Sequence, residues 1–216
     1  MGALQPPLVI PYGNGLRVTI ERHQPLRLNT MAWNFPERPD LIALVELDER
    51  LDFLRDHLRS LGGLWDKLLR LFLDAYFRDI RECIARNRPA LDALAAVHGK
   101  LFRPEDWSFS ALCPLPQARL PTAPETLVDF AFWTGADLHT IDIISMTSQS
   151  RPQREGRARL RDSGILVTEI PGAELQRGQA GDVMAALPAV FSDYWKTVPL
   201  PSSPFRIGGL ADVLPP

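Results

Sequence analysis

The chain has few of the features that assign a protein to a class directly. Its 216 residues include two cysteines, Cys83 and Cys113, which lack the close C-x-x-C spacing of a zinc site and are too few for a disulfide framework. We expect both to be buried thiols. No apolar stretch reaches the roughly 18 residues of a membrane span, and residues 1–10 lack a basic segment followed by an apolar one. The sequence therefore predicts a cytoplasmic protein with no membrane partner.

Charge and short motifs are equally sparse. The formal net charge is −2, so no global positive field indicates nucleic-acid binding, although a local patch would still serve. There is no phosphate-binding glycine loop, dinucleotide fingerprint or serine-nucleophile elbow, and the four histidines show no metal-ligand spacing. With 45% hydrophobic and 23% charged residues, the composition predicts one core, alone or with a small appendage.

The most informative segment contains two short apolar runs, 127–133 and 138–144, joined by the four residues 134–137. Both runs are rich in β-branched and aromatic residues, and the connector contains Gly135. This pattern predicts an antiparallel β-hairpin with a four-residue loop.

The register of this hairpin determines where its two aspartates lie. If Trp133 pairs with Leu138, opposed positions keep a constant index sum and Asp129 lies opposite Asp142. Opposed Cβ atoms are about 4.5–5.5 Å apart, so a bound cation, a shared proton or a nearby arginine must offset the repulsion. A divalent cation is the functional candidate. The alternative is that such acids are solvated or cap a neighbouring backbone, as they would with a loop one residue longer or shorter.

The segments around the hairpin predict an α/β core. A helix over 64–86, stopped by Pro89, is followed by an interrupted edge strand over 109–120, whose prolines cannot donate to a central ladder. Residues 151–163 have helical character, and 165–170 reads as a strand that lies parallel to one hairpin strand.

This order, with Val128-Asp129-Phe130 on the second strand and Ile141-Asp142-Ile143 on the third, resembles the core of the PD-(D/E)XK nuclease superfamily. It is similar in pattern to the small very-short-patch-repair-like endonucleases over about residues 64–195. The resemblance implies a restriction-endonuclease-like mixed sheet flanked by helices. It also implies Mg²⁺ held by Asp129 and Asp142, and hydrolysis of phosphodiester bonds in DNA.

Further residues in the helices before and after the hairpin bear on the same resemblance. Arg157, Leu160 and Gly164 match positions of the helix that follows the hairpin, and 182–195 would be the final helix. In such relatives the first helix can supply another metal-ligating acid, for which the sequence leaves three candidates open: Asp74, Asp79 and Glu82.

The chain departs from the pattern where the chemistry is decided. Asp142 replaces the commoner glutamate, which the superfamily notation allows, but Ile144 stands where the motif places lysine. Isoleucine can neither orient an attacking water nor stabilise developing charge. Gln117, Gln149 and Arg157 are candidate substitutes for that catalytic group. A descendant that keeps the fold and has lost the chemistry explains Ile144 equally well.

Arginines are concentrated after the hairpin, at Arg151, Arg154, Arg157, Arg159 and Arg161. On a helix Arg154, Arg157 and Arg161 share one face, so they are candidates for contacting nucleic-acid phosphates next to the aspartates. The alternative is a solvated arginine-rich helix with no ligand.

The remaining chain predicts an N-terminal extension and a C-terminal strap. Strands at 8–12 and 16–20 flank a Gly-Asn-Gly turn, an extended segment covers 26–33, and Asp40 is positioned to cap a helix over 41–61. We therefore expect three parts: the extension 1–62, the nuclease-like core 63–197 and a proline-rich strap 198–216. The strap packs on its own domain by default, and it offers a route to a homo-oligomer.

Two functions follow from the sequence. The first is a Mg²⁺-dependent endonuclease acting on DNA, and the second is an inactive nuclease-fold module that binds nucleic acid or protein.

Overall fold

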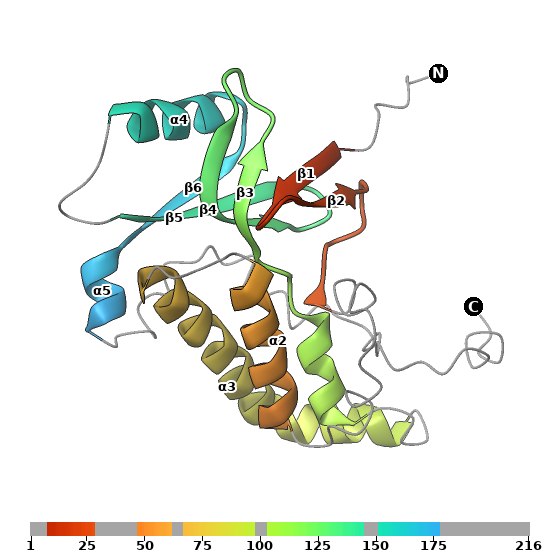
Figure 1. Ribbon diagram of the computed structural model, residues 1–216. Helices are drawn as coiled ribbons and strands as arrows, with labels where there is room; N and C mark the ends of the chain where they lie inside the picture. Colours follow the sequence, from red (N-terminus) through yellow and green to blue (C-terminus); the bar gives the residue numbers. More distant parts are fainter. Residues whose placement is uncertain (1–7, 29–46, 62–66, 98–102, 145–150, 178–216) are drawn as a thin grey trace, which may run out of the picture.

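The computed structural model describes residues 8–28, 47–61, 67–97, 103–144 and 151–177 (Figure 1). The fold is mixed α/β, with a four-stranded sheet, an N-terminal two-stranded hairpin and flanking helices. In chain order the elements are β1 (Leu8–Tyr12), β2 (Leu16–Ile20), α2 (Leu47–Leu61), α3 (Lys67–Val97), the 3₁₀ helix η2 (Pro104–Ser110), β3 (Leu115–Leu120), β4 (Thr126–Trp133), β5 (Leu138–Ile144), α4 (Arg151–Asp162), β6 (Leu166–Pro171) and α5 (Gly172–Gln176).

The predicted hairpin is confirmed as β4 and β5. Its register pairs Trp133 with Leu138 and Ala131 with Thr140, as the four-residue loop requires. Gly135 adopts φ +95°, a left-handed conformation that most other residues would adopt only with strain. The loop therefore fixes which residues of the two strands face each other.

The other two strands complete the sheet in the order β3-β4-β5-β6. Helix α4 crosses over from β5 to β6, and β6 lies parallel to β5, as predicted. Strand β3 lies antiparallel to β4 at the edge of this sheet, which also agrees with its prolines. It begins only at Leu115, because Pro104–Ser110 forms η2, so the predicted strand over 109–120 was too long.

Helix α3 corrects the expectation that Pro89 stops the first core helix. The helix runs from Lys67 to Val97 with Pro89 inside it, and Figure 1 shows it changing direction toward its C-terminal end. Residues 85–90 are all exposed, so a carbonyl left unpaired by the proline can bond to water. A proline ends a helix less reliably where the surrounding turn is solvated.

The core lies between α3 and one face of the sheet. Phe72 packs on Phe130 with ring centroids 4.6 Å apart, and Tyr76 meets Phe132 at 5.7 Å. The Tyr76 hydroxyl donates to the Leu112 carbonyl at 2.6 Å, so this buried polar group is satisfied. These contacts place the even-numbered side chains of β4 in the core.

The N-terminal hairpin is confirmed as β1 and β2, and it docks on the sheet. The Gly13 N–H donates to the Pro116 carbonyl at 2.9 Å, and the Leu26 N–H donates to the Trp133 carbonyl at 3.1 Å. Of the predicted helix 41–61 the structure describes residues 47–61, as α2. Residues 29–33, the helix at 182–195 and the strap at 198–216 lie outside the described residues, and the domain limits remain predictions.

Both cysteines are buried and free, in agreement with their predicted role as thiols in the core. Within the described ranges, every helix is too short or too polar to span a membrane.

Candidate functional site

The two aspartates face each other where the β4–β5 ladder ends. The last registered pair is Phe130 with Ile141, so continuing the register by one step places Asp129 opposite Asp142. The Asp129 N–H donates to Asp142 Oδ1 at 3.3 Å, and the Ile143 N–H donates to Asp129 Oδ2 at 2.7 Å. Each carboxylate thus bonds a backbone amide of the hairpin, in place of a further ladder bond.

Arg157 lies beside this pair and is buried. Its side chain is 7% exposed, and Nη1 is 3.6 Å from Asp142 Oδ2, whose side chain is 13% exposed. Its Nε is 3.5 Å from Glu169 Oε1 on β6. A nearby arginine was one of the three ways considered above to offset the repulsion between the aspartates, beside a bound cation and a shared proton, and Arg157 is placed to do so.

Glu169 is a functional candidate that the sequence reasoning missed. It is the registered partner of Asp142 in the parallel pair of β5 and β6. Continued register therefore places three carboxylates, from Asp129 through Asp142 to Glu169, at neighbouring positions across three strands. The sequence contained a signal for it: Glu169 is the one acidic residue of 165–170, and a strand parallel to the hairpin would carry it near the two aspartates.

Burial sets the protonation behaviour of Asp142. Desolvation raises the pKa of its carboxyl above the ordinary value of 3.8. The hydrogen bond from the Asp129 N–H and the charge of Arg157 lower the pKa, whereas the charge of Glu169 raises it. The net direction is upward, so Asp142 holds its proton to a higher pH than an exposed aspartate.

The aspartates open into a cleft of about 460 Å³. Its walls come from the start of α3, the loop before β4, the ends of β4 and β5, and α4; the polar lining side chains are Glu125, Thr126, Asp129, Asp142, Gln153, Arg157 and Arg159. Gly156 allows α4 to approach β4 closely, since a Cβ there would lie 3.1 Å from Thr126 Cγ2. This close approach brings the α4 arginines to the cleft.

The arginines of α4 do not form one exposed face. Arg157 is buried, whereas Arg154 and Arg161 are exposed. Arg161 forms an ion pair with Glu169, and Arg151 pairs with Glu155 at 2.8 Å. The three arginines predicted to share a face thus differ in exposure, because Arg157 forms its ion pairs with carboxylates of the sheet. Contact of Arg154, Arg157 and Arg161 with nucleic-acid phosphates stays a prediction.

Of the three candidates to replace the missing lysine, Arg157 lies beside Asp142 in the cleft. Ile144 lines the cleft, as its position two residues after Asp142 requires. Gln117 lies between residues that pair with Phe130 and Val128, and thus opposite Asp129, but it is not among the residues that line the cleft. Its φ of +48° interrupts regular strand geometry there. Gln149 lies outside the described residues.

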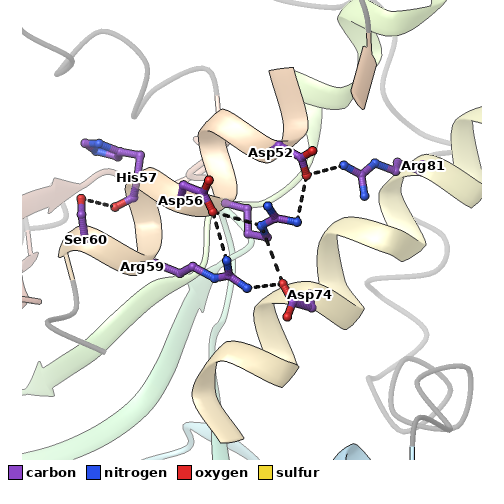
Figure 2. Close-up of polar contacts among 8 residues, drawn as sticks. Asp52, Asp56, His57, Arg59, Ser60, Asp74 and Arg81 are labelled. Atoms are coloured by element: carbon purple, nitrogen blue, oxygen red, sulfur yellow. Dashed lines mark hydrogen bonds and ion pairs between the residues drawn. The ribbon is translucent and has the colours of Figure 1, made fainter. Parts of the chain in front are cut away.

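The three acids of the first core helix lie away from the aspartate pair. The described part of α3 contributes only Leu68 and Leu69 to the cleft. Figure 2 shows Asp74 directed toward α2, where it forms an ion pair with Arg59. Asp79 lies 4.0 Å from Arg86, and Glu82 is exposed.

The donor set suits a hard cation only in part. Among the described residues no three His, Cys, Asp or Glu side chains come together as a metal-binding group. Mg²⁺ is nevertheless commonly held by one or two carboxylates together with substrate phosphates. Asp129 and Asp142 fit that mode, in which the substrate completes the coordination.

Comparisons of the chain with protein-family models, with curated proteins and with solved structures found no match. The functional argument therefore rests on the residues of this cleft.

Proposed function

We propose that the chain is a nuclease-like protein that binds DNA in this cleft and hydrolyses phosphodiester bonds with Mg²⁺ held by Asp129 and Asp142. The observation that carries the proposal is the opposition of these two carboxylates at the rim of a cleft that also contains two arginines. The order α3-β3-β4-β5-α4-β6, with β6 parallel to β5, supports it because the resemblance implies the same order.

Each residue of the cleft has a role in this proposal. A divalent cation, when bound, supplies charge stabilisation at the phosphate and a lowered pKa for bound water. Asp129 and Asp142 would hold it, and their hydrogen bonds with the strand amides keep both carboxylates in place. Arg157 keeps Asp142 ionised more than burial alone would allow, because its charge lowers the pKa of that carboxyl.

The second candidate is an inactive nuclease-fold module that binds nucleic acid or protein. Two observations favour it: Ile144 occupies the lysine position, and Arg157 already offsets part of the charge of the aspartate pair. With an internal counter-ion present, the repulsion between the aspartates no longer requires a metal. The two candidates therefore differ in whether a divalent cation binds.

Isothermal titration with Mn²⁺ separates the candidates. Wild type should bind, and Asp129→Asn and Asp142→Asn should each abolish binding, because the amide keeps an oxygen for the strand N–H but loses the charge. Asp137→Asn, which removes an exposed charge from the hairpin loop, is the matched control and should bind normally. Absence of wild-type binding, or unchanged binding in both site variants, would exclude this pair as the metal site.

Cleavage in Mn²⁺ then tests the activity itself. Plasmid and single-stranded DNA should be cut by wild type and spared by Asp142→Ala. Equal residual cleavage by both proteins would identify a contaminant and favour the inactive module.

A further inference from the structure

One arginine of the cleft has no partner in the part of the chain that the structure describes. Arg159 lies on α4, lines the cleft and is half-buried. Its Nε is buried without a hydrogen bond among the described residues. A buried donor left unsatisfied costs free energy.

The neighbouring arginines are already engaged or lie elsewhere. Arg157 is held between Asp142 and Glu169, Arg161 by Glu169, and Arg151 by Glu155. Arg154 is exposed and does not line the cleft. Arg159 is thus the arginine of α4 that lines the cleft and forms no ion pair with the residues that the structure describes.

Among the described residues, two acids that line the cleft with Arg159 are paired with other arginines. Glu125, which lines the same cleft, pairs with Arg119 at 3.3 Å, and Asp142 pairs with Arg157. The Arg159 side chain instead lies over Gly156, where Nη2 would be 3.7 Å from an added Cβ. The absence of a side chain at Gly156 leaves room for the guanidinium.

We infer that Arg159 is the residue that binds a phosphodiester group of a nucleic-acid strand in this cleft. A guanidinium presents donors in a planar fork that matches phosphate oxygens. The cleft places this fork on the same side of α4 as the aspartate pair, so a strand bound by Arg159 would present its backbone to Asp129 and Asp142. The choice of a phosphodiester rests on the proposed function, whereas binding by Arg159 requires no metal.

The test is fluorescence anisotropy with a labelled oligothymidylate at low salt in EDTA, which keeps metal out of the measurement. Arg159→Gln should weaken binding about tenfold, the size expected when one charge-assisted hydrogen-bonding contact is lost. Arg151→Gln removes the same charge from the same helix outside the cleft and should change affinity less than about twofold. Arg159→Lys keeps the charge without the fork and should fall between wild type and Arg159→Gln.

Competition identifies the source of the phosphate. Unlabelled oligothymidylate should displace the probe, and inorganic phosphate at millimolar concentration should not. Displacement by inorganic phosphate would replace the phosphodiester with a small phosphate ligand and overturn the inference. Equal affinities of the two Gln variants, or no binding by wild type, would also overturn it.

The Mn²⁺ titration of Arg159→Gln keeps this inference separate from the metal site. Intact Mn²⁺ binding with no loss of oligonucleotide affinity would reject the role of Arg159 alone. Weakened oligonucleotide binding without any Mn²⁺ binding in wild type would retain Arg159 and reject the metal-dependent activity.

Discussion

At the scale of single residues, the aspartates combine two arrangements that the sequence presents as alternatives: opposed carboxylates, and carboxylates that cap a neighbouring backbone. Asp129 and Asp142 are opposed, as the hairpin register predicts, and their carboxylates also bond backbone amides of the neighbouring strand. Arg157, a candidate for contacting phosphate, lies buried between Asp142 and Glu169 instead. Its burial follows from the helix period, because residues 156, 157 and 160 form the face of α4 that packs on the sheet.

Arg157→Gln should lower the free energy of unfolding by about 3 kcal/mol at neutral pH, the lower end of the cost of breaking a buried ion pair. The variant removes the charge that lowers the pKa of Asp142, so that pKa rises further above 3.8. As the pH falls through the raised value, the folded variant takes up a proton and the uncompensated charge disappears. In urea denaturation from pH 7 down to about pH 5, the difference in free energy of unfolding between wild type and Arg157→Gln should therefore become smaller.

Arg159→Gln is the control for this experiment, since it removes the same charge from the same helix without breaking an ion pair of the described residues. A deficit of Arg157→Gln that stays constant with pH would indicate lost packing rather than lost charge compensation.

At the scale of elements, α3 shows how solvent exposure overrides a sequence signal. Proline within a helix removes one hydrogen bond and crowds the carbonyl four residues earlier. Residues 85–90 around Pro89 are all exposed, so the carbonyl that the proline leaves unpaired can bond to water. The helix therefore continues past Pro89, and Arg88 in the same turn forms an ion pair with Glu105 of η2 at 2.6 Å.

Pro89→Ala should raise the free energy of unfolding by about 1–3 kcal/mol, because it restores the missing helical hydrogen bond. Chemical denaturation followed by circular dichroism at 222 nm, a wavelength that reports helix, measures the change. Pro121→Ala, in the exposed turn after β3, controls for the greater freedom of the unfolded chain and should be destabilising by less than about 1 kcal/mol. A loss of stability in Pro89→Ala would show that the proline suits the bend of α3.

Charge also links α2 to α3. Arg59 and Arg55 of α2 both reach Asp74, and Arg81 of α3 reaches Asp52 at 2.6 Å (Figure 2). These side chains are between one fifth and one half exposed, so each pair is weak and salt-sensitive. The network fixes how the two helices align more than how tightly they pack.

Asp74→Ala should lower the free energy of unfolding by about 1 kcal/mol at low ionic strength, and by less in high salt, because two arginines lose their shared partner. Denaturation at about 0.05 and 0.5 M NaCl measures both effects. Asp92→Ala, which removes an exposed pair within α3, should cost about 0.3 kcal/mol. Equal and salt-independent losses in the two variants would contradict a role for Asp74 in aligning the helices.

At the scale of the whole molecule, the sequence predicted what depends on local pattern. The loop around Gly135 and the β-branched runs were sufficient for the register of β4 and β5, and the helix between β5 and β6 was sufficient for parallel pairing. The limits of β3 and α3 were not predictable in this way, since the 3₁₀ helix η2 takes up part of the segment predicted as β3 and α3 continues through the exposed Pro89. The partner of Asp142 was also missed: parallel pairing placed the acid of 165–170 near the hairpin, but the register that brings Glu169 beside Asp142 is not set by local pattern.

The hydrogen bonds of the aspartate side chains have a consequence for recognition. A flexible carboxylate loses rotamer entropy when a ligand immobilises it, and that loss subtracts from affinity. Asp129 is already immobilised by the Ile143 amide, and Asp142 by the Asp129 amide. The end of the β4–β5 ladder is therefore preorganised: it presents oxygens whose conformational freedom was given up when the hairpin folded.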